Sequence, residues 1–135
     1  MSDEREAKMV IVVIKDIFKK IRGGKAVAQG GHCGATFMIE RCRRFMDKPL
    51  WTPAEKKWMF TDQQTKIVLG AKDEAEMLEV MRLFEEAKIQ VFLITDAGKT
   101  EFKGPTNTCI AVGPDWNDEI DKITGPLGIH PLKPY

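Results

Sequence analysis

"MVIVVI", residues 9–14, is a continuous apolar run made mostly of β-branched side chains. A strand with one face in water alternates apolar and polar residues, but this run has no polar position. It therefore predicts a strand that is covered on both faces. Helices elsewhere in the chain must supply that cover.

Three further runs predict strands, and the segments around them predict helices. The strands are expected at 65–70, 91–94 and 108–112, and the helices at about 25–44, after "TPAE" at 52–55, at 73–87 and at 117–124. Helices between strands require crossovers, so they are expected on both faces of a largely parallel sheet. Only residues 95–107 join two strands directly, which predicts that the fourth strand is antiparallel to the others.

Two of these helices have distinct signals. Asp73 and Glu76 have the spacing of an N-cap and its reciprocal partner. The apolar stripe that follows is expected to be core: Met77, Val80, Met81, Phe84 and Ala87. Within residues 25–44 the small and apolar residues that recur at helical spacing are Ala28, Ala35, Met38, Ile39 and Cys42.

Length and composition fit one domain. The 135 residues are 43% hydrophobic and 30% charged, which predicts a single core over residues 1–135 with a flexible N-terminus at residues 1–8. No apolar run reaches the roughly 20 residues that a membrane span needs. The N-terminus lacks the apolar segment of a signal peptide, and the three cysteines form no CxxC pair. We therefore expect a cytoplasmic protein without a metal site.

The charges are unevenly distributed. The net charge is only +1, but residues 15–48 hold nine bases and three acids. Two interpretations stay open at this point: a face that binds a polyanion, or the ordinary solvated faces of helices.

Polar residues are expected to meet at one edge of the sheet. In open α/β sheets, ligands bind beyond the carboxyl ends of the parallel strands. The loop after the first strand ends at Lys25, and the loop after the third strand begins with Asp96. An antiparallel fourth strand would start at the same edge, with Thr106 and Thr108. One edge therefore collects a lysine, a carboxylate and several hydroxyls.

The helix that follows Lys25 adds two candidates. Gln29 lies one helical turn beyond Lys25 and His32 about two turns beyond, so both side chains could line the same pocket. For His32, a role in orienting its neighbours and a role in proton transfer both stay open. Neither glycine–lysine pair, at 24–25 or at 98–99, has the earlier glycine of a phosphate-binding P-loop, which argues against a nucleotide-dependent enzyme.

Four blocks stand out: "GKAVAQGGHCG" (24–34), "KIVLGAKDEAEML" (66–78), "LITDAGKTEFKGPTNTCIAVGP" (93–114) and "DKITGPL" (121–127). In this order they resemble the blocks of the type-II peptidyl-tRNA hydrolases of archaea and eukaryotes. The resemblance runs over residues 9–127, although residues 41–64 match only loosely. It implies an α/β fold, a three-layer α/β/α sandwich with a four-stranded mixed β-sheet. It also implies hydrolysis of the ester between a peptide and the 3′ end of tRNA, with no cofactor.

The residues that this family ties to activity fall on Lys25, Asp96 and Thr100, with supporting positions at Gln29, His32, Gly98, Thr106 and Thr108. No serine, cysteine or histidine triad is visible, so we expect direct attack of water on the ester. Asp96 would orient and partly deprotonate that water. Lys25 would keep Asp96 ionised and stabilise negative charge, and Thr100 would hydrogen-bond the water or the carbonyl.

Basic side chains around the site are expected to bind the tRNA: Lys19, Lys20, Arg22, Lys99 and Lys103. Their contacts with phosphates would be independent of sequence and weakened by salt. The competing interpretation is a non-catalytic RNA- or protein-binding module that uses the same cleft. The sequence does not decide between a monomer and a homodimer.

The chain also departs from the family pattern. Ile14 stands where the family usually has Arg, Glu101 replaces a usual Gln, and Pro105 replaces a Gly. The loop before Lys25 is longer than usual. None of these departures removes a proposed catalytic group. We expect the longer loop and Pro105 to affect how the tRNA end is bound, and with it the rate and the substrate preference rather than the reaction type.

Overall fold

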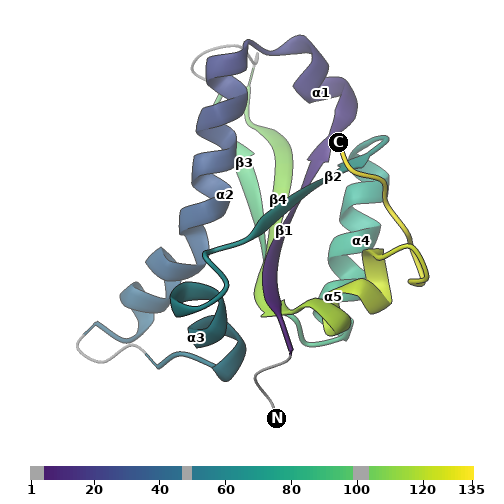
Figure 1. Ribbon diagram of the computed structural model, residues 1–135. Helices are drawn as coiled ribbons and strands as arrows, with labels where there is room; N and C mark the ends of the chain where they lie inside the picture. Colours follow the sequence, from purple (N-terminus) through teal and green to yellow (C-terminus); the bar gives the residue numbers. More distant parts are fainter. Residues whose placement is uncertain (1–4, 47–49, 99–103) are drawn as a thin grey trace.

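The computed structural model describes residues 5–46, 50–98 and 104–135. Along the chain the elements are β1 (Ala7–Ile14), α1 (Lys15–Lys20), α2 (Gly23–Arg44), α3 (Pro53–Phe60), β2 (Lys66–Ala71), α4 (Glu74–Glu86), β3 (Val91–Asp96), β4 (Thr106–Trp116) and α5 (Asn117–Thr124). Figure 1 shows the strands at the centre, with α2 and α3 on one side and α4 and α5 on the other. The expected three-layer α/β fold is confirmed.

The sheet has the order β2-β1-β4-β3. β1 and β2 are parallel, whereas β4 runs antiparallel to both of its neighbours, β1 and β3. The antiparallel direction of the fourth strand is therefore as predicted, and the other three strands share one direction. β4 lies between β1 and β3, so β1 and β2 form the one parallel pair in the described sheet. The prediction of a largely parallel sheet therefore holds for the strand directions but not for the strand pairs.

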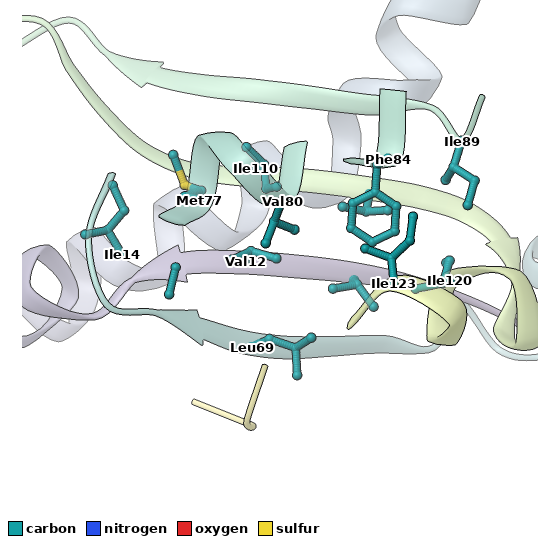
Figure 2. Packing of buried hydrophobic residues seen from close by; sticks show 13 residues of the cluster. Val12, Ile14, Leu69, Met77, Val80, Phe84, Ile89, Ile110, Ile120 and Ile123 are labelled. Atoms are coloured by element: carbon teal, nitrogen blue, oxygen red, sulfur yellow. The ribbon is translucent and has the colours of Figure 1, made fainter. Parts of the chain in front are cut away.

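β1 is buried on both faces, as its run of apolar residues predicts. Val10, Val12 and Ile14 belong to a core that α4 and α5 cover, and Figure 2 shows Val12 and Ile14 pointing into it. Met9 and Ile11 belong to a second core on the opposite face, under α2 and α3. β1 begins at Ala7, which is buried, so the flexible N-terminus expected at residues 1–8 overlaps the strand at its last two residues.

The segment after β1 differs from expectation. Residues that read as a loop form the short helix α1, and α2 then begins at Gly23. The face of α2 that turns to the sheet carries Gln29, Cys33 and Phe37. The small and apolar residues whose spacing predicted this helix lie mostly away from the sheet, with Ala28, Met38, Ile39 and Cys42 exposed. The spacing of these residues predicts the helix correctly, but they do not lie on its buried face.

The remaining helix boundaries follow local chemistry. Thr52 and Glu55 form the predicted capping box of α3. Asp73 caps α4 by accepting a hydrogen bond from the Glu76 N–H at 2.8 Å, but the Glu76 carboxylate accepts from the Lys72 N–H rather than from Asp73. In the predicted apolar stripe of α4, Met77, Val80 and Phe84 are buried and Met81 packs against them, whereas Ala87 is the exposed C-cap.

The two edges of the sheet differ. Outside β2 lies the C-terminal segment: the Gly70 N–H donates to the Lys133 carbonyl, and the Tyr135 N–H donates to the Val68 carbonyl, both at 3.0 Å. β3 forms the other edge, as Figure 2 also shows. No helix in the described part of the chain is long and apolar enough to cross a membrane.

Candidate active site

Lys25 and Asp96 meet where α2 begins and β3 ends. The Nζ atom of Lys25 lies 2.5 Å from Oδ2 of Asp96, although the two residues are 71 positions apart in the chain. Their side chains are 15% and 9% exposed, so the pair is shielded but still open to solvent on one side. The strand order had placed both at one edge of the sheet, and this proximity is confirmed.

Asp96 is held as a carboxylate. The Lys25 ammonium is the largest influence that lowers the pKa of Asp96, and hydrogen bonds from the Gly98 N–H and from Gln29 lower it further. The Gly98 N–H donates to Oδ1 at 2.8 Å, so the two carboxylate oxygens have different partners. At neutral pH the site therefore presents an ion pair whose geometry is fixed from several directions.

Gly98 allows the chain to turn at this point. Its φ of +81° lies in the region that L side chains rarely adopt, and a Cβ there would come within 2.5 Å of the Gly104 backbone. Both ends of the loop between β3 and β4 therefore approach each other beside Asp96. Thr106 is part of this closure, because its hydroxyl donates to the Gly104 carbonyl at 2.9 Å.

Gln29 connects the ion pair to the interior of the protein. Its Nε2 donates to Oδ2 of Asp96 at 3.2 Å, and its Oε1 accepts from the Thr108 hydroxyl at 2.6 Å. Gln29 and Thr108 are 1% and 0% exposed. Because an ionised carboxylate can only accept, Asp96 also determines which end of the amide faces it. Thr108 thus supports Asp96 through Gln29 rather than by direct contact.

A cleft of about 520 Å³ opens from this network. α2 forms one wall with Lys25, Gln29, His32 and Thr36, and residues 93–97 form the other. His32 is exposed on the cleft wall. Thr36 was not predicted, although its spacing continues the series that Lys25, Gln29 and His32 begin along one helix face. At about 520 Å³ the cleft is large enough to hold a small organic group.

Two cysteines lie beneath the site. Sγ of Cys33 and Sγ of Cys109 are 3.0 Å apart, and both residues are buried. The hydrogen bond with Cys109 and burial raise the pKa of Cys33, so its thiol stays protonated and cannot serve as a nucleophile at neutral pH. Within residues 5–46, 50–98 and 104–135, no three His, Cys, Asp or Glu side chains gather in a way that could hold a metal ion.

The predicted tRNA-binding residues fall into two groups. Lys19 and Lys20 end α1 and are exposed, and Arg22 is the N-cap of α2, so these three precede Lys25 at the same end of the molecule. Figure 1 shows α1 beside the start of α2. The other predicted residues, Lys99, Thr100 and Lys103, lie outside the described residues, as does Glu101.

Comparison with known proteins points to one family. The family model described as "Peptidyl-tRNA hydrolase PTH2" matches residues 7–129. A peptidyl-tRNA hydrolase of Methanopyrus kandleri is 37% identical over 120 residues, which are 89% of this chain and 95% of that protein. One from Thermococcus onnurineus is 38% identical over the same share of this chain and 94% of its own length. The mitochondrial peptidyl-tRNA hydrolase 2 of Bos taurus is 31% identical over 96% of this chain and 68% of its own length.

Proposed function

The chain belongs to the peptidyl-tRNA hydrolase PTH2 family, and from that premise we propose that Lys25, Gln29 and Asp96 form the centre at which it hydrolyses peptidyl-tRNA. The enzyme cleaves the ester between the peptide and the tRNA and releases both. The observation that supports this centre is the shielded ion pair of Lys25 and Asp96 at the mouth of the cleft. A positioned carboxylate beside a fixed cation suits a reaction in which water attacks and negative charge develops on oxygen.

Asp96 orients the attacking water. One carboxylate oxygen of Asp96 accepts a hydrogen bond from the water. The hydrogen bonds from Gln29 and from the Gly98 N–H keep the carboxyl group from rotating. Water adds to the ester carbonyl carbon, and Asp96 accepts the proton that the water loses. The bond from that carbon to the 3′ oxygen then breaks, and the proton passes to the 3′ oxygen. The products are a peptide with a free carboxyl group and a tRNA with a free 3′ hydroxyl.

Lys25 has two tasks in this scheme. In the free enzyme its ammonium lowers the pKa of Asp96, which keeps the carboxylate ionised but makes it a weak base. As negative charge develops on the carbonyl oxygen, Lys25 turns part of its hydrogen bonding to that oxygen. Asp96 then becomes more basic at the moment when the water must lose its proton. By shifting its hydrogen bond from Asp96 to the carbonyl oxygen, Lys25 therefore stabilises the oxyanion and makes Asp96 a stronger base.

Gln29 and Thr100 complete the proposal. Gln29 keeps the carboxylate in place and is itself held by Thr108. Thr100 follows Asp96 by four positions, and we assign its hydroxyl to the water or to the ester carbonyl on the strength of the sequence motif. Lys19 and Lys20 bind phosphates near the 3′ end and so bring the ester to the cleft.

The test is single-turnover cleavage of an N-acetylated aminoacyl-tRNA. Asp96→Asn keeps the shape of the side chain but removes its basicity, and Lys25→Met removes the cation; each should slow cleavage by about 10²-fold or more. Glu85→Gln removes the same negative charge from an exposed residue of α4, away from the proposed tRNA contacts, and should leave the rate within about twofold. Circular dichroism and thermal unfolding establish that the variants are folded. A near-normal rate for folded Asp96→Asn would refute this assignment.

A further inference from the structure

The cleft beside Lys25 and Asp96 is followed by another cleft between α2 and β3. Beyond Thr36 a second cleft of about 260 Å³ has α2 on one side, with Phe37, Glu40, Arg41 and Arg44, and residues 90–92 on the other. The two clefts thus follow one another along the same helix and the same strand. From Asp96 back to Gln90 the strand side spans about 20 Å, at about 3.3 Å per residue. An extended peptide of about six residues has this length.

The strand that borders both clefts has a free edge. β3 pairs with β4 on one side, and among the described residues no other segment pairs with it. The contrast with β2 is direct, because the C-terminal residues 133–135 hydrogen-bond to the outer side of β2. An uncovered edge strand presents unpaired N–H and C=O groups to which another strand can add.

The hydrogen bonds identify which groups face outward. The Gln90 carbonyl accepts from the Gly113 N–H, and the Ile94 carbonyl oxygen lies 3.3 Å from the Thr108 hydroxyl oxygen on β4, so both carbonyls face β4. Backbone groups alternate in direction along a strand. The N–H and C=O groups of Val91 and Leu93 therefore point away from β4, toward the free edge.

We propose that the peptide of peptidyl-tRNA binds as an extended strand on this edge, parallel to β3. This inference rests on the proposed function, because it takes the ester to lie at Lys25 and Asp96. The ester joins the tRNA to the carboxyl end of the peptide, so the peptide must end near Asp96, where β3 also ends. Its amino end then lies toward Gln90, where β3 begins. The two strands run in the same direction.

Pairing through the backbone suits this substrate. Every peptide offers the same N–H and C=O groups, so the edge can bind peptides of any sequence, while alternate side chains point toward α2 or away from it. A tRNA that carries a single amino acid has no further peptide backbone and cannot form these hydrogen bonds. Cleavage should therefore become more efficient as the peptide grows, up to about six residues, and should not improve beyond that length.

The first experiment uses the unaltered enzyme and tRNA that carries N-acetylated hexa-alanine. One amide at a time is N-methylated along the peptide, which removes one N–H. Strand pairing predicts that kcat/KM falls about two- to tenfold at every second amide and changes little at the amides between them. An even loss along the peptide, or no loss at any amide, would overturn the proposal.

The second experiment changes the edge itself. Val91→Pro removes an outward N–H that takes no part in pairing with β4, and Val91→Ala is its matched control because it keeps that N–H. The measured quantity is kcat/KM for N-acetyl-hexa-alanyl-tRNA divided by kcat/KM for N-acetyl-alanyl-tRNA. The ratio should fall about two- to tenfold in Val91→Pro and stay near the value of the unaltered enzyme in Val91→Ala. Equal ratios in both variants would contradict strand pairing.

The outcomes separate this inference from the proposed function. If N-acetyl-alanyl-tRNA is cleaved but neither length nor N-methylation matters, the peptide does not pair with β3 and only this inference fails. If Asp96→Asn cleaves both substrates normally, the proposed centre fails. If the free edge instead binds a second copy of the chain, light scattering will show a dimer that Val91→Pro disrupts, and the N-methyl scan will be flat; that result also overturns the proposal.

Discussion

At the scale of single residues, Gln29 uses both ends of its amide in the site. Nε2 donates to Asp96, and Oε1 accepts from the Thr108 hydroxyl. Because Gln29 is buried, an unpaired end of its amide would have no water to bond with. The position of the carboxylate thus depends on a threonine that does not touch it.

Replacing Thr108 tests this dependence. Thr108→Val keeps the volume of the side chain but leaves Oε1 of Gln29 without its donor, so the free energy of unfolding should fall by about 1–3 kcal/mol. Urea denaturation measures the loss, and single-turnover cleavage should slow because Gln29 is no longer fixed. Thr108→Ser retains the hydroxyl and should keep most of the rate. If the serine variant is as slow as the valine variant, the hydroxyl is not what supports Gln29.

The sequence predicts this site unevenly. Strand order brings Lys25 and Asp96 together, and helical spacing adds Gln29, because both arguments depend only on the regular geometry of the elements. Thr106 and Thr108 look alike in sequence, yet one hydroxyl closes the loop at Gly104 and the other reaches Gln29. That difference depends on a register shift in the pairing of β3 with β4, which no periodicity in the sequence reveals.

At the scale of elements, a buried ion pair joins α2 to α3 and the start of β3. Glu55 is fully buried, and the Arg41 guanidinium donates to both of its oxygens, at 2.7 and 2.6 Å. The Thr52 N–H and the Gln90 side chain donate to the same carboxylate. Burial alone would raise the pKa of Glu55, but these hydrogen bonds outweigh it and the pKa is lowered.

The lowered pKa determines how stability depends on pH. A carboxylate with a lowered pKa stabilises the folded state fully above its unfolded pKa of about 4.3, and this contribution is lost as the pH falls through the folded value. Arg41→Met removes the main partner and should destabilise the protein by about 3–5 kcal/mol at pH 7. The pKa of Glu55 then rises, so the difference in unfolding free energy between the variant and the unaltered protein should shrink as the pH falls toward 4.

The control for this prediction is the double variant Arg41→Met/Glu55→Gln. This double variant has no ionisable group at position 55. Its unfolding free energy should therefore lie closer to that of the unaltered protein at pH 7, and the difference should change little with pH. Urea denaturation at several pH values between 4 and 7 measures all three proteins. If the loss of unfolding free energy in Arg41→Met is constant over this range, the titration of Glu55 does not govern how stability depends on pH.

The elements also show where prediction from sequence stops. Helix ends are predictable when a capping side chain marks them, as Thr52 and Asp73 do for α3 and α4. α1 has no side-chain cap and only six residues, so nothing local distinguishes it from a loop. The position of β4 inside the sheet depends on the pairing of distant strands, which is decided by packing on both faces.

At the scale of the whole molecule, basic side chains gather at the end that holds the site. Lys19 and Lys20 are exposed on α1, and α1 lies beside the start of α2 in Figure 1. The net charge of +1 conceals this arrangement, because acids elsewhere balance it. A tRNA, which carries one negative charge per phosphate, should respond to the local charge rather than to the total.

Salt dependence provides the measurement. Each phosphate contact contributes about 0.7 to 0.9 to the slope of log kcat/KM against log salt concentration, so Lys19→Gln/Lys20→Gln should make the slope less steep by about 1.5. Lys56→Gln/Lys88→Gln removes the same charge from exposed positions in α3 and after α4, at the other end of the sheet, and should leave the slope unchanged. If both double variants reduce the slope equally, the tRNA responds to total charge, and if neither reduces it, the tRNA does not contact Lys19 and Lys20. A reduced slope in the first variant alone would locate the tRNA backbone beside α1, which is the orientation that the proposed centre at Lys25 and Asp96 requires.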